Sequence, residues 1–168
     1  SILLRDYSEL NVEKGTLLIQ QKGLTDIATF EQGNAFSKEE LSNLSPKPTI
    51  AIVSGLYELF GENHLLQDSL AGLANSMDAG NYLIYTNQPW HPQLEYIARA
   101  LTSHRDGQQW VMRRRTQLEM DQLVEQAGYQ VVCCTLLPDE RDQLAAEMRR
   151  ICDGKIADLL LTTGGTGF

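Results

Sequence analysis

The residues best suited to bind a ligand follow the first two apolar segments of the chain. Asp6 comes directly after Ile2–Arg5, and Gly33-Asn34-Ala35 comes after 27–32. Ligands of open parallel sheets bind at the carboxyl ends of the strands, so these positions are expected at one edge. A carboxylate such as Asp6 can accept hydrogen bonds from both hydroxyls of a ribose. It can equally cap the helix that follows.

Two further turns can each be interpreted as a ligand-binding turn or as a purely structural one. Asn34 can accept a hydrogen bond from an adenine amino group while Phe36 covers the ring, or the two can be a turn asparagine and a core aromatic residue. Ser54 and Gly55 end the apolar segment 49–54. A glycine there lets a ligand approach the backbone, or it serves only a strand-to-helix turn.

The loop from Asn87 to Pro92 places Trp90 and His91 between two prolines, which makes it stiff, aromatic and rich in hydrogen-bonding groups. Such loops carry function more often than not. The ordinary imidazole pKa of ~6.5 makes His91 a candidate general base. The run Arg113–Arg115 is expected to be a solvated charged segment, with contact to a substrate anion as the alternative.

Short apolar runs alternate with helical patterns, which predicts an α/β fold with a mainly parallel sheet. The expected strands are 2–5, 27–32, 49–54, 82–86, 130–136 and 157–163. The expected helices are 10–22, 38–44, 65–77, 93–103, 116–127 and 140–152. Ser8 or Asn11, Ser37 and Thr116 are the predicted helix caps, and Gly23 and Gly128 the predicted stops.

Composition excludes several classes of function. Fourteen Lys+Arg against 22 Asp+Glu give a net charge of −8, which argues against nucleic-acid and anionic-membrane partners. No apolar run approaches the ~20 residues of a membrane span, and no signal peptide is evident. The three cysteines do not form a disulfide framework, so a reducing cytoplasm is expected. Zinc-type spacings, a Walker loop and a nucleophile elbow are missing, so we expect neither a metal site nor common hydrolase chemistry.

The first three quarters of the chain resemble the C-terminal part of class I S-adenosylmethionine-dependent methyltransferases, and more narrowly a bacterial methyltransferase family. The matching strings are LRDYS (4–8), FEQGNAF (30–36), IVSGLYELF (52–60), YLIYTNQPWHP (82–92) and WVMRRRT (110–116). The fold this implies is a partial Rossmann-like methyltransferase sheet flanked by helices, with an added strand–helix–strand unit at the C-terminus.

This resemblance assigns roles to the turn residues. Asp6 would hold the cofactor ribose, and Gly33, Asn34 and Ala35 would flank the adenine. From their position after the third apolar segment, we also predict Ser54 and Gly55 as cofactor contacts. His91 and Tyr57, together with Trp90, are our candidates for the side of the methyl acceptor, which the sequence does not name. The family more often has Asp at position 34, and Asn keeps the acceptor but loses the charge.

In that family the first strand and its glycine-rich loop precede the position of Ser1, and the strand lies in the middle of the sheet. We therefore expect an open position between 2–5 and 49–54. One hypothesis is that 157–163 and its glycine-rich turn occupy it through a right-handed crossover. An incomplete sheet also favours pairing with a second copy of the chain.

The C-terminal part is similar to molybdenum-cofactor biosynthesis proteins that bind molybdopterin. The strings AGYQVV (127–132), LPDER (137–141) and LTTGGTG (161–167) carry this resemblance. It implies a pterin-binding loop formed by Thr162, Gly164, Gly165 and Thr166, whose backbone N–H groups suit an anionic phosphate.

The predicted domains are a methyltransferase-like α/β domain over 1–128 and a molybdopterin-binding-like segment over 129–168. Three functions follow from these two domains: an S-adenosylmethionine-dependent methyltransferase, a molybdopterin-binding module, and an inactive fusion or fragment.

Overall fold

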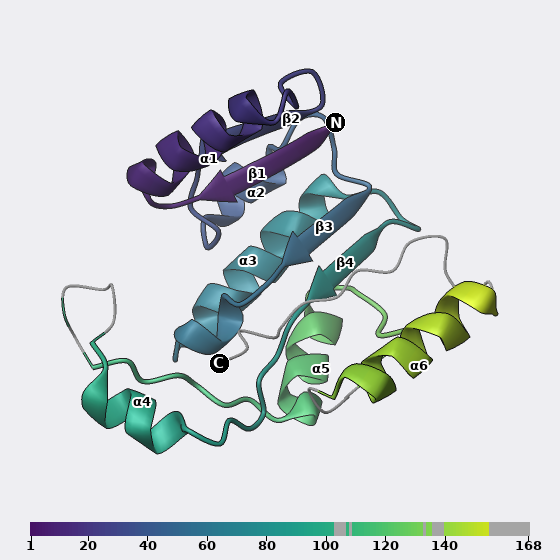
Figure 1. Cartoon of the computed structure of the whole chain (residues 1–168). Coiled ribbons are helices and arrows are strands. Elements are labelled where there is room, and N and C mark those ends of the chain that lie inside the picture. The colour runs from purple at the N-terminus through teal and green to yellow at the C-terminus, as the bar shows by residue number, and fades with distance from the viewer. Residues whose placement is uncertain (103–106, 108, 133, 136–139, 155–168) are drawn as a thin grey trace. The chain divides into compact units, whose positions relative to one another are not determined.

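The structure, a computed structural model, describes residues 1–102, 107, 109–132, 134–135 and 140–154 (Figure 1). Its strands are β1 (Ile2–Asp6), β2 (Ala28–Gln32), β3 (Ile50–Val53) and β4 (Tyr82–Tyr85). Its α-helices are α1 (Glu9–Gln21), α2 (Lys38–Ser42), α3 (Asn63–Ser76), α4 (Leu94–Ala100), α5 (Gln117–Gln126) and α6 (Arg141–Asp153). A short 3-10 turn, η1, covers Tyr57–Leu59.

The predicted mixed α/β composition is confirmed, with short strands that form two two-stranded sheets, β1–β2 and β3–β4. β1 and β2 are parallel, in a register from Ile2 opposite Ala28 to Asp6 opposite Gln32. Among the described residues no ladder joins β1 to β3. The segment 157–163, predicted to fill that position, lies outside the described residues.

The two strands of the other sheet, β3 and β4, are parallel. The N–H of Tyr82 donates to the carbonyl of Thr49 over 3.1 Å, and that of Thr86 donates to the carbonyl of Val53 over 3.1 Å. The carboxyl ends of β3 and β4 are therefore adjacent, and the turns that follow them start side by side.

The chain divides into two compact units that are interleaved in sequence. The first unit comprises 1–51, 62–83 and 123–129, and the second comprises 52–61, 84–122 and the residues from 130 on. In the first unit α1 packs against β1 and β2, and α2 packs against α3 (Figure 1). The second unit contains η1, α4, α6 and the long loops around them.

The core of the first unit depends on a close approach of α2 and α3. Leu41, Leu66, Leu70 and Leu73 are buried there. A Cβ atom added at Gly72 would lie 2.7 Å from the Cβ of Leu41 and 3.0 Å from the carbonyl of Lys38, so only glycine fits this crossing.

Side-chain caps start the helices where the sequence predicts them. The Oγ of Ser8 accepts from the N–H of Asn11, and the Oγ of Ser37 accepts from that of Glu40. The Oγ1 of Thr116 accepts from the N–H of Glu119 over 3.2 Å. Each bond satisfies one of the free N–H groups of a first helical turn.

The strand predicted over 130–136 is wrong for the residues that the structure describes there. Residues 130–132 and 134–135 form no strand, and no described strand pairs with them. An apolar run becomes a strand only when a neighbouring strand satisfies its backbone groups. The helix predicted after it does form, as α6.

Candidate functional site

Asp6 is the last residue of β1, and its carboxylate holds the first turn that follows. Its Oδ1 accepts from the N–H of Ser8 over 2.8 Å, and its Oδ2 accepts from the Nδ2 of Asn11 over 3.2 Å. Asp6 therefore orients the start of α1, although the residue that caps this helix is Ser8. A carboxylate has about four acceptor positions, and the bonds to described residues use two of them.

The first unit places the predicted ribose and adenine residues next to each other. The N–H of Gly33 donates to the backbone carbonyl of Asp6 over 3.0 Å, which extends the β1–β2 ladder by one bond. Gly33 is also packed against a cation: a Cβ atom there would lie 2.1 Å from Nη2 of Arg5. Ala35 follows in the same turn and is half-buried.

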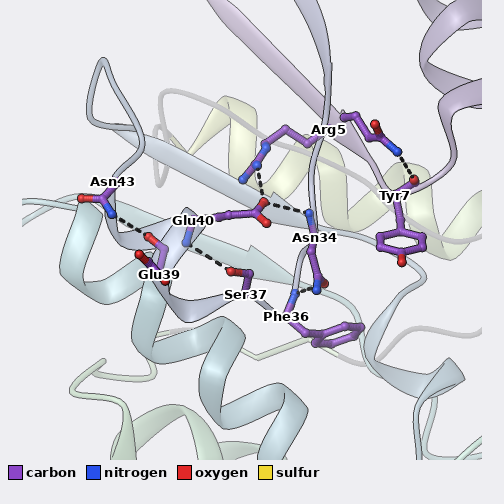
Figure 2. Close-up of polar contacts among 9 residues, drawn as sticks. Arg5, Tyr7, Asn34, Phe36, Ser37, Glu39, Glu40 and Asn43 are labelled. Atoms are coloured by element: carbon purple, nitrogen blue, oxygen red, sulfur yellow. Dashed lines mark hydrogen bonds and ion pairs between the residues drawn. The ribbon is translucent and has the colours of Figure 1, made fainter.

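A carboxylate that sequence reasoning missed holds this turn in place. Oε2 of Glu40 accepts from Nη2 of Arg5 and from the N–H of Asn34, each over 3.0 Å (Figure 2). Oδ1 of Asn34 accepts from the N–H of Phe36 over 2.9 Å, which uses one of its two lone pairs. The spacing of Ser37 and Glu40, that of a capping box, was the signal for Glu40.

Arg5 has more donors than its described partners use. Its Nε and Nη1 are buried without a hydrogen-bond partner among the described residues. Beside it, Nε2 of Gln32 donates to the carbonyl of Tyr7 over 3.1 Å (Figure 2). The carboxyl ends of β1 and β2 are therefore tied together by side chains as well as by the ladder.

A shallow depression of about 520 Å³ lies along α1 and is lined by Glu9, Val12, Glu13, Thr16, Leu17 and Gln32. Neither Asp6 nor Asn34 lines it, so it is distinct from the turn described above.

In the second unit, the turn after β3 is bonded to the end of β4. Gly55 has a φ of 65°, and its N–H donates to Oγ1 of Thr86 over 2.8 Å. Ser54 and Gly55 are both exposed. Further along the loop from β4, Nδ1 of His91 accepts from the N–H of Gln93 over 3.1 Å. Since Nδ1 is the acceptor in this bond, the neutral imidazole carries its proton on Nε2.

The arginine run is solvated only in part, and the expectation is wrong for Arg115. This side chain is 1% exposed, and it donates to the carbonyls of Tyr57 (2.8 Å), Phe60 (2.9 Å) and Gly61 (3.2 Å). The turn after β3 presents carbonyls that need donors, and a guanidinium supplies several in one plane. Tyr57 itself is 1% exposed, with its phenol ring inside the unit.

Glu58 is a second buried charge in this turn that the sequence did not reveal. Its backbone carbonyl accepts from the N–H of Arg113 over 2.7 Å, and the residue is 8% exposed. Its Oε2 has no hydrogen-bond partner among the residues that the structure describes. Burial raises the pKa of this carboxyl, an effect that its own backbone N–H and the charge of Arg115 only partly oppose.

The pterin-loop residues Thr162, Gly164, Gly165 and Thr166 lie outside the described residues. Within the part of the chain that the structure describes, no three His, Cys, Asp or Glu side chains gather as metal ligands. In that same part, no helix combines the length and apolar character that crossing a bilayer requires.

The chain is similar to two described protein families and to one curated protein. The family described as "Putative methyltransferase" matches residues 1–137, and the chain belongs to this family. A second family, described as "Probable molybdopterin binding domain", matches residues 117–168, so the two matched ranges overlap. "Uncharacterized protein YnbC" of Escherichia coli (strain K12) is 62% identical over 139 residues, or 83% of this chain. The chain spans 23% of the length of that relative.

Proposed function

We propose that this chain carries the nucleoside-binding part of an S-adenosylmethionine-dependent methyltransferase of the class I type. Membership of the methyltransferase family supports the reaction class. The observation that carries the cofactor is the placement of Asp6, with two unused acceptor positions, beside the Gly33–Asn34 turn. A carboxylate that can accept from both hydroxyls of a ribose, next to a turn with polar groups, suits an adenosine.

In this proposal the ribose hydroxyls donate to the Asp6 carboxylate. The adenine lies along Gly33, Asn34 and Ala35, where Oδ1 of Asn34 accepts from the exocyclic amino group. Glu40 keeps the turn preformed, which lowers the entropic cost of binding. S-adenosylmethionine, when bound, supplies an electrophilic methyl group on a sulfonium centre.

In the second unit Ser54 and Gly55 remain predicted cofactor contacts, and His91 and Tyr57 remain predicted residues of the acceptor side. Because Nδ1 of His91 accepts from the N–H of Gln93, the neutral ring carries its proton on Nε2, so a proton-accepting role requires Nδ1 to release this bond. Because Tyr57 is 1% exposed, any contact of its phenol with an acceptor requires a movement of η1. The methyl acceptor is not identified. We also propose that the protein is cytoplasmic and that it pairs with a second copy of itself.

Molybdopterin binding is the second candidate function, favoured by the family match over residues 117–168. Its predicted contact residues are Thr162, Gly164, Gly165 and Thr166. Binding of molybdopterin that these four residues control, without any binding of S-adenosylmethionine, would replace the first proposal by the second.

Calorimetric titration with S-adenosylhomocysteine tests the first proposal. We expect Asp6→Asn to weaken binding about tenfold or more, because charge-assisted hydrogen bonds are worth about 1.5–3 kcal/mol. Asp26→Asn, an exposed aspartate in the turn before β2, is the matched control and should bind like the wild type. No heat at millimolar ligand, or equal binding by Asp6→Asn and wild type, contradicts the proposal.

A further inference from the structure

The side-chain amide of Asn34 has a fixed orientation in the turn after β2. Its Oδ1 accepts from the N–H of Phe36 over 2.9 Å (Figure 2). Only the oxygen of an amide can accept such a bond, so the amide cannot rotate by half a turn without losing it. This orientation decides which polar groups the turn presents to a ligand.

The nitrogen of this amide is available to a ligand. Among the described residues Nδ2 of Asn34 has no acceptor, and the buried side-chain atoms that lack a partner there belong to Arg5 and Glu58. Nδ2 therefore reaches the surface, where its two N–H groups can donate. Because Oδ1 uses one of its two lone pairs on Phe36, the side chain combines free donors with an acceptor.

A carboxylate already lies in the same turn, which makes a neutral side chain at position 34 favourable. Oε2 of Glu40 accepts from the N–H of Asn34 and from Nη2 of Arg5, each over 3.0 Å. The guanidinium of Arg5 balances this negative charge. A second carboxylate at position 34 would share that cation with Glu40, whereas the amide of Asn34 needs no counter-charge.

The group at carbon 6 distinguishes the common purines. Adenine carries an amino group there, which donates, whereas guanine and hypoxanthine carry a carbonyl oxygen, which accepts. An ionised carboxylate can only accept, so it binds the amino group and repels the carbonyl oxygen. An amide has an acceptor and donors side by side, so it can bind either group.

We propose that Asn34 is the specificity-determining residue of the base site, and that the site binds purine nucleosides with either an amino or a carbonyl group at carbon 6. This inference rests on the proposed function, which takes the base to lie along Gly33, Asn34 and Ala35. Oδ1 of Asn34 accepts from the amino group of adenine, and Nδ2 donates to the carbonyl oxygen of a 6-oxopurine. Asn34 and Asp6 both belong to the first compact unit, so the whole nucleoside site lies within it.

Calorimetric titration of the full wild-type chain with two ligands is the first test. S-inosylhomocysteine is S-adenosylhomocysteine with hypoxanthine in place of adenine, so the two differ at the edge that carries the carbon-6 group. We expect the wild type to bind them within about fivefold of each other, because Asn34 offers a partner to each. A larger preference for S-adenosylhomocysteine overturns the inference, and this readout does not depend on the folding of a variant.

Asn34→Asp is the second test, and it keeps the turn, because a carboxylate oxygen also accepts from the N–H of Phe36. This variant should bind S-inosylhomocysteine about tenfold or more weaker than S-adenosylhomocysteine, because the carboxylate repels the carbonyl oxygen and leaves it without a donor. Asn75→Asp, the same change at an exposed position of α3, is the matched control and should keep the wild-type ratio. Equal ratios for Asn34→Asp and the wild type overturn the inference.

The outcomes separate the two proposals. Binding of S-adenosylhomocysteine by a wild type that rejects S-inosylhomocysteine overturns the role of Asn34 and leaves the proposed function intact. If neither ligand binds, the proposed function and this inference both fail.

Discussion

At the scale of single residues, the turn after β3 depends on Arg115. Its guanidinium reaches three backbone carbonyls in a buried position. We expect Arg115→Lys to lower the free energy of unfolding by about 1–3 kcal/mol, because an ammonium cannot reproduce the planar donor set and leaves a carbonyl unsatisfied.

Arg114→Lys is the matched control for this change, since Arg114 is the exposed neighbour in the same run. Urea unfolding of both variants and of the wild type measures the difference. Equal midpoints for Arg115→Lys and Arg114→Lys would mean that the carbonyls of the turn do not need the guanidinium.

The raised pKa of Glu58 makes stability depend on pH in a defined window. The folded state holds its proton to higher pH than the unfolded state does, so between the ordinary Glu pKa of 4.5 and the raised value, stability decreases as pH rises. At pH values above the raised pKa, Glu58 no longer makes the stability depend on pH. Glu58→Gln should lack that slope and be more stable than the wild type at pH 7.

Thermal unfolding of both proteins over a pH range that begins below the ordinary Glu pKa of 4.5 gives the comparison. A stability difference between the two proteins that does not change as the pH rises above 4.5, or a Glu58→Gln variant that is less stable than the wild type at pH 7, contradicts this prediction.

The candidate turn at the ends of β1 and β2 was predictable from the sequence, but the residues that hold it in place were not. Asp6, Gly33 and Asn34 follow apolar segments that end in turn residues, and the rule for strand ends places such residues at one edge. Arg5 and Glu40 are far apart in sequence, so only the fold shows that they pair. Arg115 is buried and Arg114 is exposed, although the two are identical in type and adjacent.

At the scale of elements, the packing of α2 on α3 depends on Gly72. Replacing an exposed helical glycine by alanine gains about 1 kcal/mol of helix propensity. At Gly72 the new Cβ would meet the Cβ of Leu41 at 2.7 Å and the backbone of Lys38 at 3.0 Å. We expect Gly72→Ala to destabilise the protein by about 1–3 kcal/mol, because overpacking forces the helices apart.

Asp68→Ala, at an exposed position of the same helix, provides the control and should unfold within about 0.5 kcal/mol of the wild type. Chemical denaturation measures both variants. A Gly72→Ala protein that is more stable than the wild type would show that the helices have room to adjust.

Helices were easier to predict than strands for a physical reason. A helix satisfies its backbone internally, so the caps at Ser8, Ser37 and Thr116 suffice to mark where α1, α2 and α5 begin. A strand needs a neighbour, and the apolar run after Tyr129 has none among the described residues. Among the described residues, the predicted strands that form are β1 to β4, which pair.

At the scale of the whole molecule, the strands present apolar side chains to solvent. Ile2 is 54% exposed, Leu4 is 42% exposed and Ile52 is 50% exposed. Within the described part of the chain, the β1–β2 and β3–β4 sheets have two strands each. Exposed apolar strand edges are templates for pairing with another chain, so we expect the protein to self-associate as its concentration rises.

Sedimentation velocity over a range of concentrations measures this association. Leu3→Lys places a charge on β1 and should reduce the association, whereas Leu10→Lys makes the same change on α1 and should not. A wild type that sediments as a monomer at all concentrations, or equal effects of the two lysines, would show that β1 does not mediate pairing.

The central claim is that the carboxyl ends of β1 and β2 bind the adenosine of S-adenosylmethionine. Titration of ¹⁵N-labelled protein with S-adenosylhomocysteine, followed by amide chemical shifts, tests it most directly. We predict that the largest saturable shifts occur at the amides of Ser8, Gly33, Asn34 and Phe36, which donate to or adjoin the proposed contacts. Saturable binding that leaves these amides unshifted, or a spectrum unchanged at millimolar ligand, would contradict the claim.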